Sequence, residues 1–234
     1  MGTGLEMRNT FCLVALLSGL ALAGCGSDPE AADGQRSLLA GVKLGSLVVN
    51  LAHKPGSEGL DPTQAAALRV ALTKSGQPIY AVSIVDLGYA NLMAPYGQNG
   101  PVQTWASTAY ETISMRDGIV VATRGFGPDI MTTVAPDIAQ VSRASGSFAR
   151  SYYYLDGADQ KYQLTYACTF APVGTETVTV LGKAYATRRV NEFCVGSDSS
   201  FENTYWFDGG GKLRQSDQRL APGLKAMRLQ RVID

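Results

Sequence analysis

The hydrophobic residues of the chain follow two different periods, and the change comes near Gln77. After that position apolar and polar residues alternate in runs separated by Gly, Asp, Asn and Pro: IYAVSIV, YETISM, GIVVATR, FARSYYYL, KYQLTYACTF, ETVTVL, AYATRRVNEF, TYWF and MRLQRVI. Alternation predicts strands with one buried face, and the short connections leave no room for crossover helices. We therefore predict an all-β-dominated fold, an antiparallel meander of about ten strands that forms a sandwich or a curved half-barrel.

Two Asp-Gly pairs predict turns between neighbouring strands. Asp117-Gly118 and Asp156-Gly157 each stand between two of the runs. Glycine after aspartate supplies the positive φ that a tight hairpin turn needs.

The segment before Gln77 predicts short N-terminal helices. Residues 37–51 place their leucines and valines in approximate helical spacing, although Gly41 and Gly45 weaken the pattern. The next helix is better marked, because Asp61 is a suitable N-cap and Pro62 suits the first helical position. We expect it to run from Pro62 to about Leu72.

The first residues have the features of a secretory signal. Arg8 precedes an apolar run, Phe11 to Ala23, which is shorter than the roughly 20 residues that a membrane-spanning helix needs. Leu22-Ala23-Gly24-Cys25 resembles a bacterial lipobox, in which the cysteine is lipidated and becomes the first mature residue. We expect a signal peptide over 1–24, a lipidated tether over 25–37 and a β domain over 38–234. The alternative is an ordinary secreted protein cut near Ala23, with Cys25 as a free thiol.

The predicted anchor indicates a location. A cysteine that carries three acyl chains, palmitate among them, stays on its membrane, because anchoring strength rises with each buried methylene group. In bacteria related to Escherichia, Asp directly after this cysteine retains a lipoprotein at the inner membrane, and here the next residue is Gly26. We therefore expect the periplasmic face of the outer membrane, with contact to the bilayer through the lipid alone.

The charge balance gives no sign of a nucleic-acid partner. The chain has 20 basic and 20 acidic residues, and removal of residues 1–24 takes away one of each. A nucleic-acid-binding domain would show a basic excess.

Two cysteines lie within the β region, Cys168 and Cys194, in two different predicted strands. The periplasm is oxidising, so we expect a disulfide between them. The alternative is a pair of buried free thiols.

Catalytic chemistry finds little support in the sequence. The chain has a single histidine, His53, and no zinc-protease helix, nucleophile elbow or complete phosphate loop, so we expect no metal and no cofactor. Glu192, Glu202 and Asp208 could supply the two acids of a glycoside hydrolase if two of them lay about 5 to 10 Å apart. The sequence does not give that distance, and we predict no catalytic residue.

Aromatic residues gather in three strands: Tyr152 to Tyr154, Tyr162 with Tyr166, and Tyr205 to Phe207. Exposed rings could stack on sugars, which makes Asn203, Tyr205 and Trp206 candidate contacts for a glycan or a partner. The alternative, favoured by the strand propensity of aromatic residues, is that these rings form the core.

The surroundings of those rings resemble a known family. Glu192-Phe193-Cys194, the run Phe201 to Asp208, then Gly211, Ser216, Gln218 and Pro222, together with Asp117 to Phe126 and Asp129-Ile130, are similar to the YjbF/GfcB family of exopolysaccharide and group 4 capsule lipoproteins. As architecture, Asn203 and Asp208 can cap or turn a hairpin, and Gln218 can satisfy a buried backbone group. The resemblance implies export companions: an outer-membrane protein and small secreted proteins.

We therefore predict an outer-membrane lipoprotein that acts as a non-catalytic accessory in exopolysaccharide or capsule secretion. Its expected partners are the polysaccharide, outer-membrane export proteins, or both. Three alternatives stay open: a glycan-binding module, a half-barrel that carries a lipid, and a polysaccharide-processing enzyme.

Overall fold

The computed structural model describes residues 61–234. The predicted signal peptide, Cys25, the tether, the helical segment over 37–51 and His53 lie outside the described residues. The described helices are α3 (Pro62–Thr73), the short 3-10 helix η1 (Val85–Leu87) and α4 (Ile138–Arg143). The described strands are β1 (Ile79–Ile84), β2 (Tyr89–Asn99), β3 (Val102–Ala106), β4 (Thr112–Arg116), β5 (Ile119–Arg124), β6 (Thr132–Val134), β7 (Ser147–Leu155), β8 (Lys161–Val180), β9 (Lys183–Val195), β10 (Ser200–Asp208), β11 (Leu213–Gln218) and β12 (Met227–Ile233).

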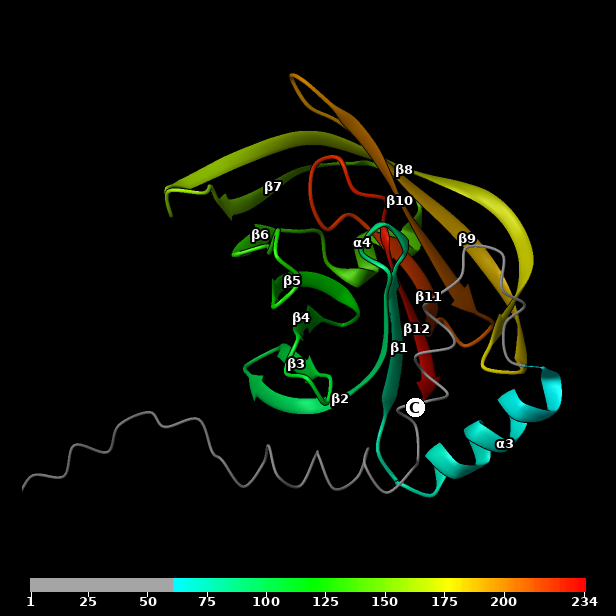
Figure 1. Cartoon of the computed structure of the whole chain (residues 1–234). Helices are drawn as coiled ribbons and strands as arrows, with labels where there is room; N and C mark the ends of the chain where they lie inside the picture. Colours follow the sequence, from blue (N-terminus) through cyan, green and yellow to red (C-terminus); the bar gives the residue numbers. More distant parts are fainter. Residues whose placement is uncertain (1–60) are drawn as a thin grey trace, which may run out of the picture.

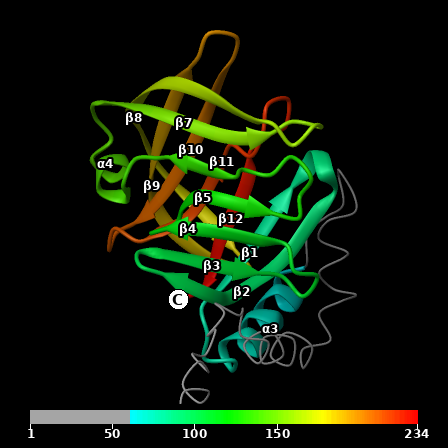
Figure 2. The same ribbon diagram turned by 90° about the vertical axis from the view of Figure 1, so that its left-hand side faces the viewer.

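All of these strands form one antiparallel sheet in the order β5-β4-β3-β2-β1-β12-β11-β10-β9-β8-β7-β6. Each strand pairs with its neighbours in the chain, except that β5 and β6 form no ladder and β1 pairs with β12. The sheet curves until β5 and β6 approach each other, as Figure 1 shows, and Figure 2 gives a second view of the curved sheet. The Thr123 N–H of β5 donates to the carbonyl of Ile130, in the connection just before β6, at 2.9 Å. The predicted meander is confirmed, and its form is a nearly closed, barrel-like sheet rather than a sandwich.

The helix α3 confirms the prediction made from Asp61 and Pro62. The Asp61 carboxylate accepts hydrogen bonds from the Thr63 and Gln64 N–H groups at 2.8 and 3.0 Å. Leu68 and Leu72 of this helix pack with Val180, Trp206 and Val232. In Figure 1 α3 lies outside the curve of the sheet, below the β8–β9 hairpin, so this cluster covers part of the outer face.

The inner face of the sheet holds two further apolar clusters. One contains Tyr152, Tyr154 and Tyr166, and the other contains Val190, Tyr205 and Phe207. The helix α4, which the sequence pattern did not indicate, packs Val141 against the second cluster at one end of the sheet. A capping box between Asp137 and Gln140 begins this helix.

One predicted turn has the expected geometry and the other differs in detail. Asp117 and Gly118 both have positive φ, 51° and 88°, between β4 and β5. Between β7 and β8 the positive φ belongs to Asp159, at 57°, and not to Gly157. The Asp156 carboxylate supports this wider turn, because it accepts from the N–H groups of Ala158 and Gln160.

A β-bulge divides the long strand β8 into two halves. The register with β9 shifts between Pro172 and Gly174, so the alternation of faces changes there. Before the bulge Cys168 and Phe170 face the interior. After it Thr175, opposite Arg188, and Thr177, opposite Ala186, take the inner side. Val178 and Val180 pack outward in the cluster with α3. The bulge thus lets one strand line the interior and also cover a helix.

None of the helices formed by residues 61–234 is long and apolar enough to span a membrane.

Candidate functional site

The three residues predicted as glycan or partner contacts are buried. Asn203 and Tyr205 are 0% exposed on the inner face of β10, and Trp206 is 7% exposed on the outer face. The Trp206 indole N–H donates to Glu176 at 2.5 Å. This burial argues against direct contact with a glycan through these side chains, and it supports the alternative interpretation that the aromatic residues belong to the core.

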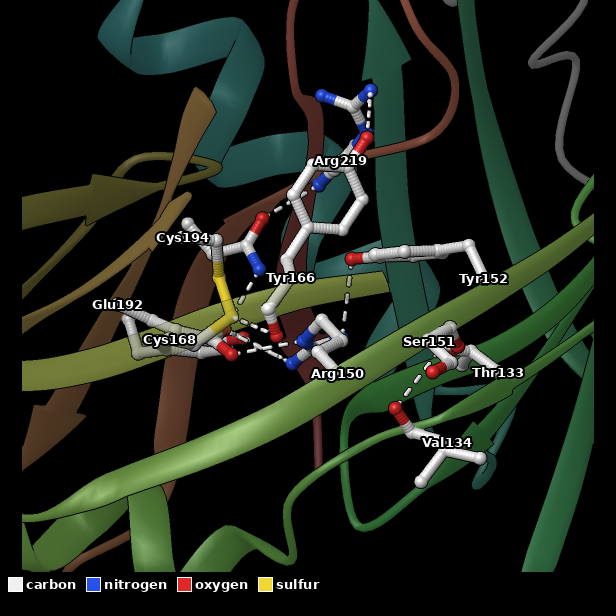
Figure 3. The surroundings of a disulfide bond; sticks show 12 residues. Thr133, Val134, Arg150, Ser151, Tyr152, Tyr166, Cys168, Glu192, Cys194 and Arg219 are labelled. Carbon is white, nitrogen blue, oxygen red and sulfur yellow. Dashed lines mark hydrogen bonds and ion pairs between the residues drawn. A yellow bond between two sulfur atoms is a disulfide. The ribbon is translucent and has the colours of Figure 1, made fainter. Parts of the chain in front are cut away.

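A buried ion pair joins β7 to β9 inside the sheet. The Arg150 guanidinium donates to both Glu192 oxygens, at 2.8 and 3.0 Å, and the two residues are 1% and 0% exposed. Asn203 and Tyr205 also donate to Glu192, at 2.7 and 2.8 Å. The Asn203 amide oxygen accepts from the Arg219 N–H at 2.7 Å, so the same cluster continues to the end of β11. Figure 3 shows Arg150 and Glu192 beside the disulfide.

The charges and hydrogen bonds of this cluster indicate a structural role. Burial raises the pKa of the Tyr205 hydroxyl well above its usual 10.0, and the charge of Glu192 raises this pKa further. Tyr205 therefore remains a hydrogen-bond donor at physiological pH. Because protein donors occupy both Glu192 oxygens, we interpret this carboxylate as the counter-ion of Arg150.

Arg150 was not among the residues singled out from the sequence. The signal was nonetheless present: Arg150 has the same strand parity as Tyr152 and Tyr154, so all three side chains point to one face. If the tyrosine face is core, Arg150 must be buried and must have a partner.

The predicted disulfide between Cys168 and Cys194 is present. The two residues lie directly opposite each other in β8 and β9, with Cα atoms 4.0 Å apart, and both are fully buried. Glu192 lies close to both sulfur atoms. This grouping does not have the character of a metal site, because the sulfur atoms are bonded to each other and Glu192 is bound to Arg150.

The three acids considered for glycoside hydrolysis do not converge. Glu192 lies in the interior, whereas Glu202 is exposed on the opposite face of the sheet. Asp208 lies in the β10–β11 turn, where it accepts from the N–H groups of Gly210 and Lys212 and pairs with Arg214 at 2.6 Å. The turn role predicted for Asp208 is confirmed; the one predicted for Asn203 is wrong, since Asn203 is a buried partner of Glu192.

Gln218 has the predicted role of satisfying buried backbone groups. Its side-chain oxygen accepts from the Val120 N–H at 3.0 Å, and its nitrogen donates to the Gly118 carbonyl at 2.8 Å. The same nitrogen also donates to Ser216. These bonds cross the interior from β11 to the start of β5.

An open cleft of about 530 Å³ lies where the inner faces of β8, β9 and β10 end. Its walls include Thr175, Thr177, Ala186, Arg188 and Phe207. Thr175 stands directly opposite Arg188, and Arg188 directly opposite Phe207, in neighbouring strands. The sequence patterns did not indicate this cleft, because the β8 bulge decides which threonines face it.

The sequence matches the model of a protein family described as group 4 capsule polysaccharide lipoprotein GfcB, YjbF, over residues 57–232. No functionally curated protein shows significant sequence similarity to the chain. The fold is similar to that of the hypothetical lipoprotein YmcC from Escherichia coli, with a TM-score of 0.64 and 14% identity over 77% of this chain and 98% of that one. A protein from Parabacteroides distasonis, described as a candidate lipoprotein, has a TM-score of 0.32 and 11% identity over 66% of this chain and 92% of the other.

Proposed function

The chain belongs to the YjbF family of group 4 capsule polysaccharide lipoproteins, and on this premise we propose that it is an outer-membrane lipoprotein that assists secretion or assembly of a capsule polysaccharide or exopolysaccharide. The family match over residues 57–232 is the observation that carries this proposal. In it, Cys25 is the lipid attachment site, and the β domain works on the periplasmic face of the membrane beside export proteins.

Two features support an accessory role without catalysis. Glu192, Glu202 and Asp208 do not form a convergent pair of acids, and Glu192 is occupied by Arg150, Asn203 and Tyr205. The interior next to them is filled by aromatic side chains such as Tyr152, Tyr154 and Phe207, which argues against the alternative of a half-barrel that carries an acyl chain. The proposed role is therefore to hold partners or polysaccharide at the membrane.

The proposal is tested by deleting the gene in its native host and measuring surface and secreted polysaccharide. We expect the polysaccharide to fall and an unaltered copy of the gene to restore it. A Cys25→Ala copy, which cannot be lipidated, should fail to restore it although the protein accumulates. Unchanged polysaccharide after deletion would contradict the proposed role.

A matched control distinguishes the effect of the membrane in which the protein is anchored from the effect of losing the lipid. Gly26→Asp keeps Cys25 and its lipid but introduces the residue that, in bacteria related to Escherichia, retains a lipoprotein at the inner membrane. We expect this variant to fractionate with the inner membrane and to restore little polysaccharide. Full restoration by Gly26→Asp from the inner membrane would contradict the outer-membrane location.

A further inference from the structure

Arg188 is a fixed positive charge on the wall of the inner cleft. Its guanidinium donates to the carbonyl and the hydroxyl of Ser142 in α4, at 2.8 and 3.2 Å, and lies 5.3 Å from the centre of the Phe207 ring. Within residues 61–234, no carboxylate forms an ion pair with Arg188. Its neighbour on the outer face, Arg189, does have such a partner in Glu176. Arg188 is thus held in place and lacks a counter-ion.

The two acids at the rim of the cleft are engaged elsewhere. The Glu176 carboxylate binds the Trp206 indole and Arg189 on the outer side of the sheet. Asp208 is bound by Arg214 and by two backbone N–H groups of its own turn. Neither acid forms an ion pair with Arg188, so the cleft keeps a positive site.

The remaining walls offer hydroxyl groups and a small apolar surface. Thr175 and Thr177 are exposed and follow the inner side of β8, while Ala186 and Phe207 supply apolar atoms. A volume of about 530 Å³ lies within the range of small-molecule sites. Threonine hydroxyls both donate and accept, as sugar hydroxyls do, and a guanidinium can donate two parallel hydrogen bonds to a carboxylate or phosphate.

We infer that this cleft binds one acidic sugar unit of a polysaccharide, with the anionic group on Arg188 and the ring hydroxyls on Thr175 and Thr177. The inference rests on the proposed function and adds the substrate class and the place where it binds. Carboxylate and phosphate share the chemistry that Arg188 recognises, and the test must distinguish them.

The test is calorimetric titration of the purified full-length chain in detergent with four probes. These are a uronic-acid tetrasaccharide, the same tetrasaccharide with its carboxyl groups reduced to alcohols, a hexose phosphate and inorganic phosphate. We expect the uronic-acid probe, the hexose phosphate, or both to bind at least about tenfold more tightly than the neutral probe, because a charge-assisted hydrogen bond is lost with the charge. Raised salt should weaken the binding.

Variants of the chain locate the binding site. Arg188→Gln should weaken binding of the acidic probe by about tenfold or more, whereas Arg228→Gln in β12, an exposed arginine whose partner Asp217 does not line the cleft, should leave it within about twofold. Arg188→Gln also removes the contact with Phe207, so a second variant controls for folding. Thr175→Val with Thr177→Val keeps the shape of both exposed side chains and should weaken binding several-fold at an unchanged melting temperature.

Three results would overturn the inference: no binding by either acidic probe, equal binding of the neutral probe, or unchanged binding in both Arg188→Gln and the threonine double variant. Inorganic phosphate that binds as tightly as the sugar probes would also overturn it, since the cleft would then be an anion site without sugar recognition. Absent binding in a protein that still restores polysaccharide in the host would refute the cleft assignment alone. Intact binding with no effect of gene deletion would refute the proposed function alone.

Discussion

The buried ion pair gives a sharp test of how the interior is held together. Replacing Glu192 with Met removes a carboxylate that accepts two hydrogen bonds from Arg150 and one each from Asn203 and Tyr205. Methionine is unbranched and of similar length, so the change removes charge and acceptors with little loss of volume. Arg150 is then a charged group, 1% exposed, without its counter-ion.

The expected cost follows from that burial. Breaking a buried ion pair by removing one partner destabilises a protein by about 3 to 5 kcal/mol, because the remaining charge is neither solvated nor paired. For a domain of this size each kcal/mol lowers the melting temperature by about 2 to 4 °C. We therefore expect Glu192→Met to lower the melting temperature by about 6 to 20 °C. Removing both charges, with Arg150→Met in addition, should cost less than Glu192→Met alone.

The assay is urea unfolding of the oxidised protein, followed by circular dichroism, for both single variants and the double variant. The matched control is Glu202→Met, because Glu202 lies in the adjacent strand but is exposed on the outer face. We expect this control to change the free energy of unfolding by no more than about 0.5 kcal/mol. Additive effects of the two single substitutions, or a cost below about 1 kcal/mol for Glu192→Met, would refute the reasoning.

Three further predictions concern other parts of the fold. Gln218→Leu should lower the free energy of unfolding by about 2 kcal/mol or more, measured by urea unfolding, because it leaves the Val120 N–H and the Gly118 carbonyl buried without a partner; a loss below about 0.5 kcal/mol would contradict this. Cys168 and Cys194 are 26 residues apart in the chain, so the chain-entropy model predicts that reduction of their disulfide lowers the free energy of unfolding by up to about 3 to 4 kcal/mol. Urea unfolding with and without reductant measures this loss, and equal unfolding midpoints would show that the disulfide adds no stability. The pKa of Asp208 is shifted below its usual 3.8: burial opposes this shift, but the Lys212 N–H and Arg214 outweigh it. Because that pKa is lower in the folded chain, the stabilisation is present above about pH 4 and is lost as the pH falls through the folded value. The melting temperature of Asp208→Asn should therefore fall less below pH 4 than that of the unaltered chain. An equal fall of the melting temperature in both proteins would contradict this.

Most of the sheet was predictable because its strands keep strict alternation between turn signals. The runs that became β1, β5, β7 and β12 have one apolar face and clear ends. Proline and glycine residues inside two other strands, β2 and β8, made the extent of these strands harder to predict. β2 contains Pro95 and Gly97, which predict a break, and the structure accommodates both at a register shift opposite β3. Pro172 and Gly174 divided β8 into two predicted strands, although the chain continues through a bulge.

The site was less predictable because it depends on which face of a strand each side chain occupies, and on contacts between residues far apart in the chain. The sequence marks Glu192 and Asn203 as parts of a motif. Arg150, the ion-pair partner that accounts for the burial of Glu192 and its neighbour Asn203, lies 42 residues before Glu192 in the chain. α4 has only six residues, too few for a helical period to be evident. The orientation of Thr175 toward the cleft follows from the β8 bulge, and a sequence pattern does not fix where the register shifts.

The size of the sheet explains why large polar residues lie in its interior. An eight-stranded barrel is just wide enough for ordinary side chains to fill, and a wider sheet encloses more space. Here the space is filled by long side chains, Arg150, Tyr152, Tyr154 and Tyr205 among them, and by Leu220, whose carbonyl accepts from the Tyr154 hydroxyl at 3.0 Å. Each polar end therefore needs a buried partner, and Glu192, Asn203 and Gln218 provide acceptors and donors at those points.

The cleft lies where this filling stops. Beyond the row formed by Thr175, Arg188 and Phe207, the inner side chains become small: Thr177, Ala186 and Gly209 line the space. A single large residue in that row would extend the packed interior and close the cleft, as Ala186→Phe is expected to do. The side chains that fill the barrel thus end at an accessible inner surface, and Arg188, which carries a positive charge on that surface, forms no ion pair with a carboxylate of residues 61–234.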